Sequence, residues 1–265
     1  MNKRPIGIFD SGLGGLTAVM ALRKLMPEEN IVYFADSARV PYGSKSRAEL
    51  LVMARQDLDF VASLSAKAVI AACGTVSSNA ADILESYPLP VTGVLKPGIE
   101  AMARTPGSAP LGIIATAASI KSGVFRRELE KAAPGRQIVA LPCPEFVPLI
   151  ESGRTAPDDP ALLQAVERAL APARAAGVSA LLLGCTHYGI IRESIQAYMG
   201  DGVELISAAD CAAEESCRRL RSLGLTGGSG ECRCYTSGPK EEFSAAASAL
   251  LGFELHAEHV PPMKI

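Results

Sequence analysis

The chain has 265 residues, of which 48% are hydrophobic and 20% charged, and its formal net charge is −2. This length suits one large α/β domain or two smaller ones, and the hydrophobic content excludes a disordered chain. The near-neutral charge, without a run of Lys or Arg, argues against nucleic acid as a partner, and no apolar run approaches the roughly 20 residues of a membrane-spanning helix.

Eight short apolar runs predict β-strands. In most of them the residues are apolar at successive positions, which is typical of strands buried on both faces of a parallel sheet. In chain order the runs are Ile6–Phe9, Ile31–Phe34, Ala68–Ala72, Val91–Val94, Leu111–Ala115, Ile138–Leu141, Ala180–Leu183 and Leu205–Ile206.

Amphipathic stretches between these runs predict helices. Ser46 and Glu49 form a capping box at the start of one helix. Another helix has Leu or Val every four residues over Leu162–Leu170, ahead of Pro172 and Gly177, which are typical of helix ends. The alternation of strands and helices predicts an α/β fold that is doubly wound around mainly parallel sheets.

A faint internal repeat divides the chain into two similar halves. Pro5–Ile8 resembles Pro110–Ile113, and Val69–Thr75 resembles Leu181–Thr186 in the same order. Residues 105–110 are rich in Pro, Gly and Ser and predict the crossover between the halves. Each half would then carry a cysteine just after a strand.

Cys73 and Cys185 are these two cysteines, and ligands bind at the carboxyl ends of strands in open parallel sheets. Buried structural thiols are one interpretation, and a disulfide, disfavoured in a reducing compartment, is another. We favour a third, in which one thiolate removes a proton from a substrate carbon while the opposite thiol delivers one. A helix N-terminus after each strand would lower the thiol pKa from about 8.5 toward neutrality.

The chain has seven cysteines. An odd count without a Cys-x-x-Cys pair suits free thiols in a reducing compartment, so we expect a cytoplasmic protein. His187 lies two residues after Cys185 and could hydrogen-bond or protonate that thiol. A zinc site that adds Cys232 and Cys234 is an alternative, although the spacing matches no standard finger and this second pair lies in a strand-like run.

Asp10 ends the first strand, and the glycine-rich segment 12–15 opens a helix. Glycines there would let backbone amides approach an anion, although neither the Walker nor the dinucleotide fingerprint is complete. Asp10 and Ser11 could equally well cap the helix. The segment 41–44, Pro-Tyr-Gly-Ser, predicts a turn whose amides could hold a carboxylate.

Taken together, these motifs resemble the glutamate racemase family of the cofactor-independent aspartate/glutamate racemase superfamily. The resemblance implies two α/β domains, residues 1–97 plus 208–265 and residues 98–207, with the active site in the cleft between them. It also implies racemisation of glutamate for bacterial peptidoglycan synthesis, without cofactor or metal, by a homodimer. The segments that carry it are Ile8–Gly15, Asp36 with Pro41–Gly43, Ala72–Thr75, Thr116–Ser122 and Gly184–Tyr188.

The resemblance further implies a role for each motif residue. Cys73 and Cys185 would be the acid/base thiols on opposite faces of the substrate Cα. Asp10 would tune the first thiol, and His187, assisted by Glu151, the second. The residues expected to line the substrate are Asp10, Ser11, Pro41, Tyr42, Gly43, Ser44, Gly74, Thr75, Ser119 and Thr186.

Three positions depart from the family's pattern. Gly74 stands where Asn usually follows the first cysteine, Ser119 replaces Thr and Gly189 replaces Pro. The loss of a side-chain amide at Gly74 leaves a racemase for aspartate or another amino acid as an alternative. A non-catalytic carboxylate-binding protein with redox thiols is a second alternative. A pyridoxal enzyme using Lys96 or Lys121 is a weaker one.

Overall fold

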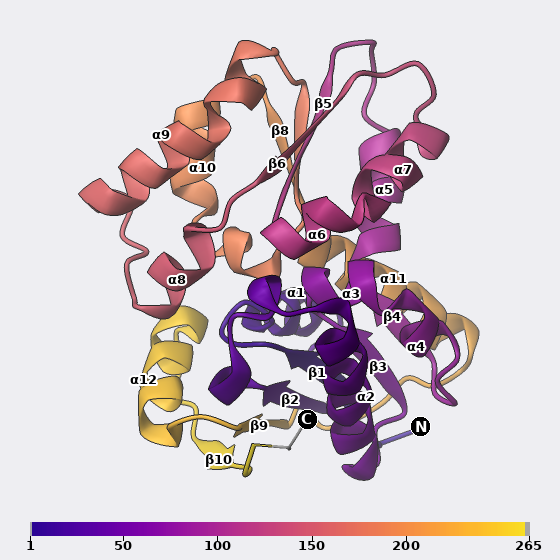
Figure 1. Ribbon diagram of the computed structural model, residues 1–265. Helices are drawn as coiled ribbons and strands as arrows, with labels where there is room; N and C mark the ends of the chain where they lie inside the picture. Colours follow the sequence, from indigo (N-terminus) through magenta and orange to yellow (C-terminus); the bar gives the residue numbers. More distant parts are fainter. Residues whose placement is uncertain (1, 263–265) are drawn as a thin grey trace.

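The computed structural model describes residues 2–262 and contains two parallel sheets, one in each of two lobes (Figure 1). We call the six-stranded sheet with its helices the first lobe and the four-stranded sheet with its helices the second lobe. The strands are β1 (Ile6–Asp10), β2 (Ile31–Ala35), β3 (Ala68–Ala71), β4 (Val91–Gly93), β5 (Leu111–Ala115), β6 (Ile138–Pro142), β7 (Ala180–Leu183), β8 (Glu204–Ser207), β9 (Cys232–Thr236) and β10 (Ala257–His259).

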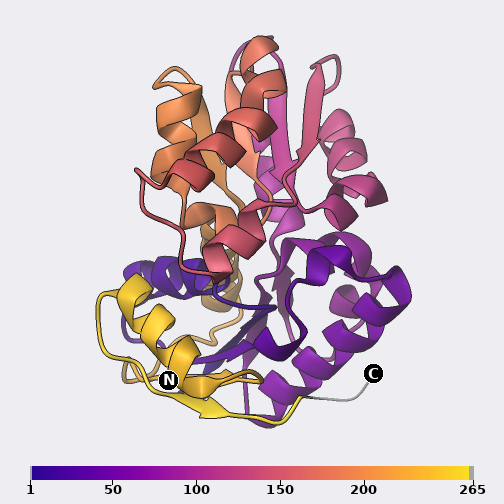
Figure 2. The same cartoon turned by 60° about the vertical axis from the view of Figure 1, so that its left-hand side comes forward.

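Helices follow most strands and cover both faces of the sheets (Figures 1 and 2). The α-helices are α1 (Leu16–Leu25), α2 (Arg47–Ser63), α3 (Gly74–Asn79), α4 (Ala81–Glu85), α5 (Leu95–Ala103), α6 (Ala117–Ser122), α7 (Val124–Ala132), α8 (Phe146–Glu151), α9 (Pro160–Ala175), α10 (Arg192–Met199), α11 (Ala208–Ser222) and α12 (Lys240–Leu251). Three short 3-10 helices are η1 (Ser37–Arg39), η2 (Tyr42–Ser44) and η3 (Thr186–Gly189).

The strand order confirms the predicted doubly wound fold and its internal repeat. The first sheet runs β10-β9-β2-β1-β3-β4 and the second β6-β5-β7-β8, with all pairs parallel. The order β2-β1-β3-β4 therefore recurs as β6-β5-β7-β8. The repeated sequence motifs lie on β1 and β5 and at the ends of β3 and β7, which are equivalent strands in the two sheets.

Local sequence signals explain most helix boundaries. The Ser46–Glu49 capping box is present at the start of α2, with both hydrogen bonds formed. Helix α9 does not stop before Pro172 but continues to Ala175, since a proline removes only one helical hydrogen bond and this one is tolerated in the last turn. Strand β10 had no sequence signal that predicted it.

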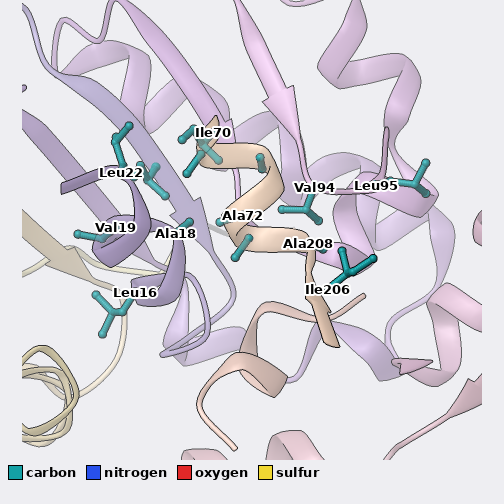
Figure 3. Packing of buried hydrophobic residues seen from close by; sticks show 14 of the residues in the cluster. Leu16, Ala18, Val19, Leu22, Ile70, Ala72, Val94, Leu95, Ile206 and Ala208 are labelled. Atoms are coloured by element: carbon teal, nitrogen blue, oxygen red, sulfur yellow. The ribbon is translucent and has the colours of Figure 1, made fainter. Parts of the chain in front are cut away.

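The core is continuous between the lobes. One buried apolar cluster extends from α1 and β1 through α5 and α11 to β5 and β7. Figure 3 shows part of it, with Leu16, Val19 and Leu22 of α1 on one side of α11 and Val94 and Leu95 on the other. Helices α5 and α11, which lie where the chain passes between the lobes, are thus packed together.

The sheets draw their strands from separate parts of the sequence. Residues 6–93 and 232–259 supply the first sheet, and residues 111–207 supply the second. The domain limits 1–97 plus 208–265 and 98–207 stay a prediction, and residues 1 and 263–265 of that division lie outside the described residues. No helix within residues 2–262 combines the length and apolar composition needed to cross a membrane.

Candidate active site

The carboxyl ends of the strands in the two sheets face each other where the lobes meet (Figure 1). β1 and β3 run side by side, so Asp10 and Cys73, which end or follow them, share one edge. β5 and β7 likewise bring Thr116 and Cys185 to the opposing edge. Helices α3 and α6 are in contact across this boundary, so the expected cleft is closed in this structure.

Both candidate thiols are free and buried in this boundary. Cys73 is 4% and Cys185 6% exposed, and no disulfide joins them. Burial, and next the charge of Asp10, raise the pKa of the Cys73 thiol well above its usual value, although the amides of Val76 and Thr75 oppose this. The expected lowering of this pKa by a helix N-terminus is therefore wrong for the closed structure, because desolvation outweighs the amides of the six-residue helix α3.

Asp10 is buried beside Cys73. Its Oδ2 atom accepts a hydrogen bond from the Gly15 amide at 2.7 Å and lies 3.4 Å from the hydroxyl of Thr186. Its Oδ1 atom has no hydrogen-bond partner among the described residues. Burial raises the pKa of Asp10, while the charge of His187 lowers it. A carboxyl with a raised pKa and an unused oxygen next to a thiol is suited to exchange a proton with that thiol.

His187 connects Cys185 to Glu151. Its Nδ1 atom lies 3.8 Å from the Cys185 sulfur and 3.9 Å from Oδ2 of Asp10. Its Nε2 atom lies 2.6 Å from Oε1 of Glu151. Burial alone would lower the pKa of His187, but its hydrogen bonds to Cys185 and Glu151 and the charges around it raise that pKa well above 6.5. The ring can thus carry a proton next to Cys185.

Glu151 reaches from α8 of the second lobe into the glycine-rich loop of the first. Its Oε1 atom accepts a hydrogen bond from the Leu13 amide at 2.8 Å. The loop therefore does hold an anion through a backbone amide, and that anion is a side chain of this protein. The Thr17 hydroxyl adds a hydrogen bond to Gly14 O at 2.7 Å and lies 3.4 Å from Thr186 O of the second lobe.

The side chains of the turn 41–44 form hydrogen bonds within the first lobe, whereas the sequence prediction for this turn concerned its backbone amides. The buried hydroxyl of Tyr42 donates to Asp36 and lies 2.9 Å from Oδ2 of Asp57, inside the first lobe. Ser44 is exposed and bonds to Pro41 O at 3.1 Å. Gly43 lies at the lobe boundary against Thr116. A substrate contact from this turn would therefore have to come from its backbone.

Asp57 is a buried acid that the sequence reasoning missed. It is fully buried on α2, and burial followed by the charge of Asp36 raises its pKa well above the usual value. Arg39 pairs with both acids, and the Ser237 hydroxyl donates to Asp36. The available signal was a charged residue on the apolar face of the predicted helix.

Four hydroxyl groups meet across the boundary near Cys73. Oγ1 of Thr75 lies 2.9 Å from Oγ1 of Thr116, and Oγ of Ser119 lies 3.0 Å from that same Thr116 oxygen. The Ser78 hydroxyl closes the group at 3.1 Å from Ser119. Thr75 and Ser119 were expected to line the substrate, whereas Ser78 had no predicted role.

The geometry does not support two of the alternatives, the zinc site and the pyridoxal enzyme. Cys232 and Cys234 lie on β9 of the first sheet, whereas Cys185 follows β7 of the second. Within residues 2–262 no three His, Cys, Asp or Glu side chains are grouped as a metal site. Lys96 and Lys121 are exposed, so neither is poised to form a buried Schiff base.

Known proteins resemble this chain over almost its full length. The sequence model of the family described as Asp/Glu/Hydantoin racemase matches residues 17–216. A glutamate racemase of Picosynechococcus sp. is 36% identical over 97% of this chain and 92% of its own.

Solved structures agree in fold. A glutamate racemase isoform of Bacillus anthracis superposes with a TM-score of 0.92 at 28% identity, covering 100% of both chains. A glutamate racemase of Francisella tularensis, solved in complex with D-glutamate, has a TM-score of 0.89 at 34% identity and covers 99% of both chains.

Proposed function

The chain belongs to the Asp/Glu/hydantoin racemase family, and from that premise we propose that it interconverts L- and D-glutamate without a cofactor. The observation that carries the proposal is a pair of free, buried thiols. They follow equivalent strands of two similar sheets and are buried where those sheets face each other. Inversion of a carbon centre needs a proton acceptor on one face and a donor on the other, which such a pair provides.

In the proposed reaction, one cysteine thiolate removes the proton from Cα and becomes a thiol. The electron pair left on Cα is delocalised into the α-carboxylate. The opposite cysteine thiol then gives its proton to the other face of Cα and becomes a thiolate, so atoms and charge balance. In the reverse direction the two thiols exchange roles.

Different neighbours would restore the protonation state of each thiol after the reaction. On the first side, Asp10 would exchange a proton with Cys73, and its raised pKa and unpartnered Oδ1 support this. On the second side, His187 would supply or take the proton of Cys185, held in place by Glu151. A carboxyl group thus serves one thiol and an imidazole the other.

Substrate entry requires the lobes to separate, because both thiols are buried in the closed structure. We propose that the lobes pivot about the packed helices α5 and α11. On reclosing, water would be excluded from the reacting carbon, which strengthens every electrostatic contact to it. The backbone amides of segments 10–15 and 41–44, with the hydroxyls of Thr75, Ser119 and Thr186, would then hold the substrate's carboxylates and amine.

The test follows the Cα proton. The protein is incubated with L-glutamate in deuterated water, and D-glutamate carrying deuterium at Cα is the expected product. Absence of both exchange and inversion from either enantiomer would reject the proposal. A parallel incubation with L-aspartate addresses the alternative substrate, and we expect it to be slower than L-glutamate.

Three further expectations rest on the family resemblance and stay predictions. They are a homodimer, a cytoplasmic location and a role in supplying D-glutamate for peptidoglycan. Light scattering at several protein concentrations would measure the first, and depletion of the protein in cells supplied or not with D-glutamate would test the last.

A further inference from the structure

Gly74 and Gly184 approach each other across the lobe boundary, directly beside the two thiols. A Cβ atom built on Gly74 would lie 2.0 Å from the carbonyl oxygen of Gly184, 3.1 Å from its carbonyl carbon and 3.5 Å from Cα of Cys185. All three are backbone atoms, so no side-chain rotation could relieve the overlap. At the separation of the two segments in this structure, only a residue without a Cβ fits at position 74.

Similar contacts occur along the rest of the boundary. A Cβ on Gly12 would lie 2.1 Å from Oε1 of Glu151, and one on Gly14 would lie 2.2 Å from Nδ1 of His187. The neighbours of Gly12 are at the end of a side chain, which can move, whereas a Cβ on Gly14 would also lie 2.6 Å from the backbone nitrogen of His187. The contact of Gly74 is the shorter of these two backbone contacts, and it lies between the two backbone segments that carry the thiols.

The cluster of four buried hydroxyls described above holds α3 against the second lobe, one turn beyond Gly74. Ser78 is 4% exposed, and its Oγ atom lies 2.8 Å from Gly74 O and 3.1 Å from the hydroxyl of Ser119 on α6. Thr75 and Thr116 form the neighbouring bridge. Helix α3, which begins directly after Cys73, is thus joined to the second lobe by contact at its start and by hydrogen bonds one turn later.

We propose that Gly74 and Ser78 are positioning residues that set how closely the Cys73 and Cys185 segments approach when the lobes close. This inference rests on the proposed function only in taking these thiols as the reacting groups. Gly74 sets the limit of approach because it has no side chain to hold the segments apart. Ser78 holds the helix at that limit through its bridge to Ser119. A larger residue at position 74 keeps the lobes apart and exposes both thiols.

The test measures alkylation of individual cysteines by iodoacetamide, without substrate, using peptide mass spectrometry. In Gly74→Ala, Cys73 and Cys185 should both react several-fold faster than in the unaltered protein. Cys217 and Cys234 are 3% and 2% exposed and should stay unreactive, which verifies that the fold is intact. The matched control is Gly202→Ala, since a Cβ at that exposed glycine meets nothing within 4 Å. It should react like the unaltered protein.

Two results would overturn the proposal. One is an unchanged alkylation rate at both thiols in Gly74→Ala. The other is a faster rate at Cys73 alone, because that would mean local disorder of α3 rather than separation of the lobes.

Ser78→Ala provides a second test, which does not depend on whether Gly74→Ala folds. It adds no volume and removes the bridge to Ser119, so both thiols should again react faster, by a smaller factor. Its control is Ser86→Ala, which loses the same kind of helical hydrogen bond, from Ser86 to Asp82 O, at an exposed site. Equal alkylation rates in the two serine variants would reject the role of Ser78.

Racemisation by the same variants separates this inference from the proposed function. Misplacement of a reacting group by about 1 Å can cost roughly 100-fold in rate. Gly74→Ala should therefore lose far more in kcat than Ser78→Ala. If the unaltered protein shows no Cα exchange, the proposed function fails, while the alkylation result still decides whether Gly74 sets the approach of the lobes.

Discussion

Nε2 of His187 lies 2.6 Å from Oε1 of Glu151, and the other ring nitrogen lies 3.8 Å from the sulfur of Cys185. The imidazole therefore connects a carboxylate to a thiol, whereas Cys73 has a carboxyl group, Asp10, directly beside it. Each side of the site therefore has one cysteine thiol, but the neighbouring ionisable group is a carboxyl on one side and an imidazole on the other. Rates in the two directions should consequently depend on different residues.

Glu151→Gln should lower the pKa of His187, because it removes a negative charge and keeps the side chain's shape. If protonated His187 serves Cys185, activity is lost as pH rises through that pKa. The alkaline limb of kcat should therefore move to lower pH in the variant. Initial rates from pH 6 to 10 measure this, and Glu145→Gln, at an exposed residue paired with Arg168, is the control. An unmoved limb would show that Glu151 does not act through His187.

The same variant has a stability consequence whose sign follows from linkage. His187 has a folded pKa above its unfolded value near 6.5, so its charged form stabilises the fold below about pH 6.5. This contribution disappears as pH rises through the folded pKa. Glu151→Gln should therefore reduce the free energy of unfolding most at acid pH and least at high pH, as thermal unfolding across that range would show.

Asp10→Asn should stabilise the protein at neutral pH while removing activity. The pKa of Asp10 is raised by burial, so its ionised form costs stability, and that cost grows as pH rises from the unfolded pKa through the folded one. Asn carries no charge and can still accept the Gly15 hydrogen bond. We expect a Tm several degrees higher at pH 7, with each kcal/mol worth about 2–4 °C in a chain of this size.

Catalysis by Asp10→Asn should fail mainly where Cys73 must lose its proton. The direction that begins at Cys73 should slow more than the one that begins at Cys185, when each is followed by the first incorporation of deuterium. Asp201→Asn, at an exposed residue, is the control for both readouts. An equal loss in the two directions would contradict a one-sided role for Asp10.

Much of this arrangement was accessible from sequence because it follows from local pattern. The strands buried on both faces are apolar at successive positions, and parallel pairing brings the residues that follow them to one edge. The repeat then relates Cys73 to Cys185, so their pairing can be predicted even though they are far apart along the chain. The overall fold and the location of the candidate site were therefore predictable.

Contacts that depend on the relative position of the lobes were not. The bridge between Ser78 and Ser119 joins short polar residues of two helices, and nothing in either sequence segment requires it. The resemblance places Tyr42 at the substrate, whereas in the structure the packing of α2 brings the Tyr42 hydroxyl to Asp57. Burial also reversed the expected pKa of Cys73, since the sequence gives the helix start but not the desolvation.

Tyr42→Phe tests which of those two directions matters. Removing the hydroxyl leaves Asp36 and Asp57 buried with one hydrogen-bond donor fewer, so the free energy of unfolding should fall by about 1–3 kcal/mol. KM for glutamate should change little, since the hydroxyl lies inside the first lobe. Tyr87→Phe, which loses an exposed hydrogen bond to Asp59, should be nearly neutral. A large rise in KM with unchanged stability would instead place the hydroxyl on the substrate.

Replacing either candidate thiol separates two-sided from one-sided proton transfer. Cys73→Ser and Cys185→Ser should each lose racemisation, because a serine hydroxyl is far too weak an acid to supply an oxyanion base near neutral pH. Each variant keeps one thiol, so it should still exchange the Cα proton of only one enantiomer with deuterated solvent, and the two variants should act on opposite enantiomers. Chiral chromatography with mass detection reads both inversion and exchange. Cys211→Ser, at a partly exposed cysteine of α11, should retain full activity. Full racemisation by either thiol variant would show that the pair of sulfur atoms is not the acid/base machinery.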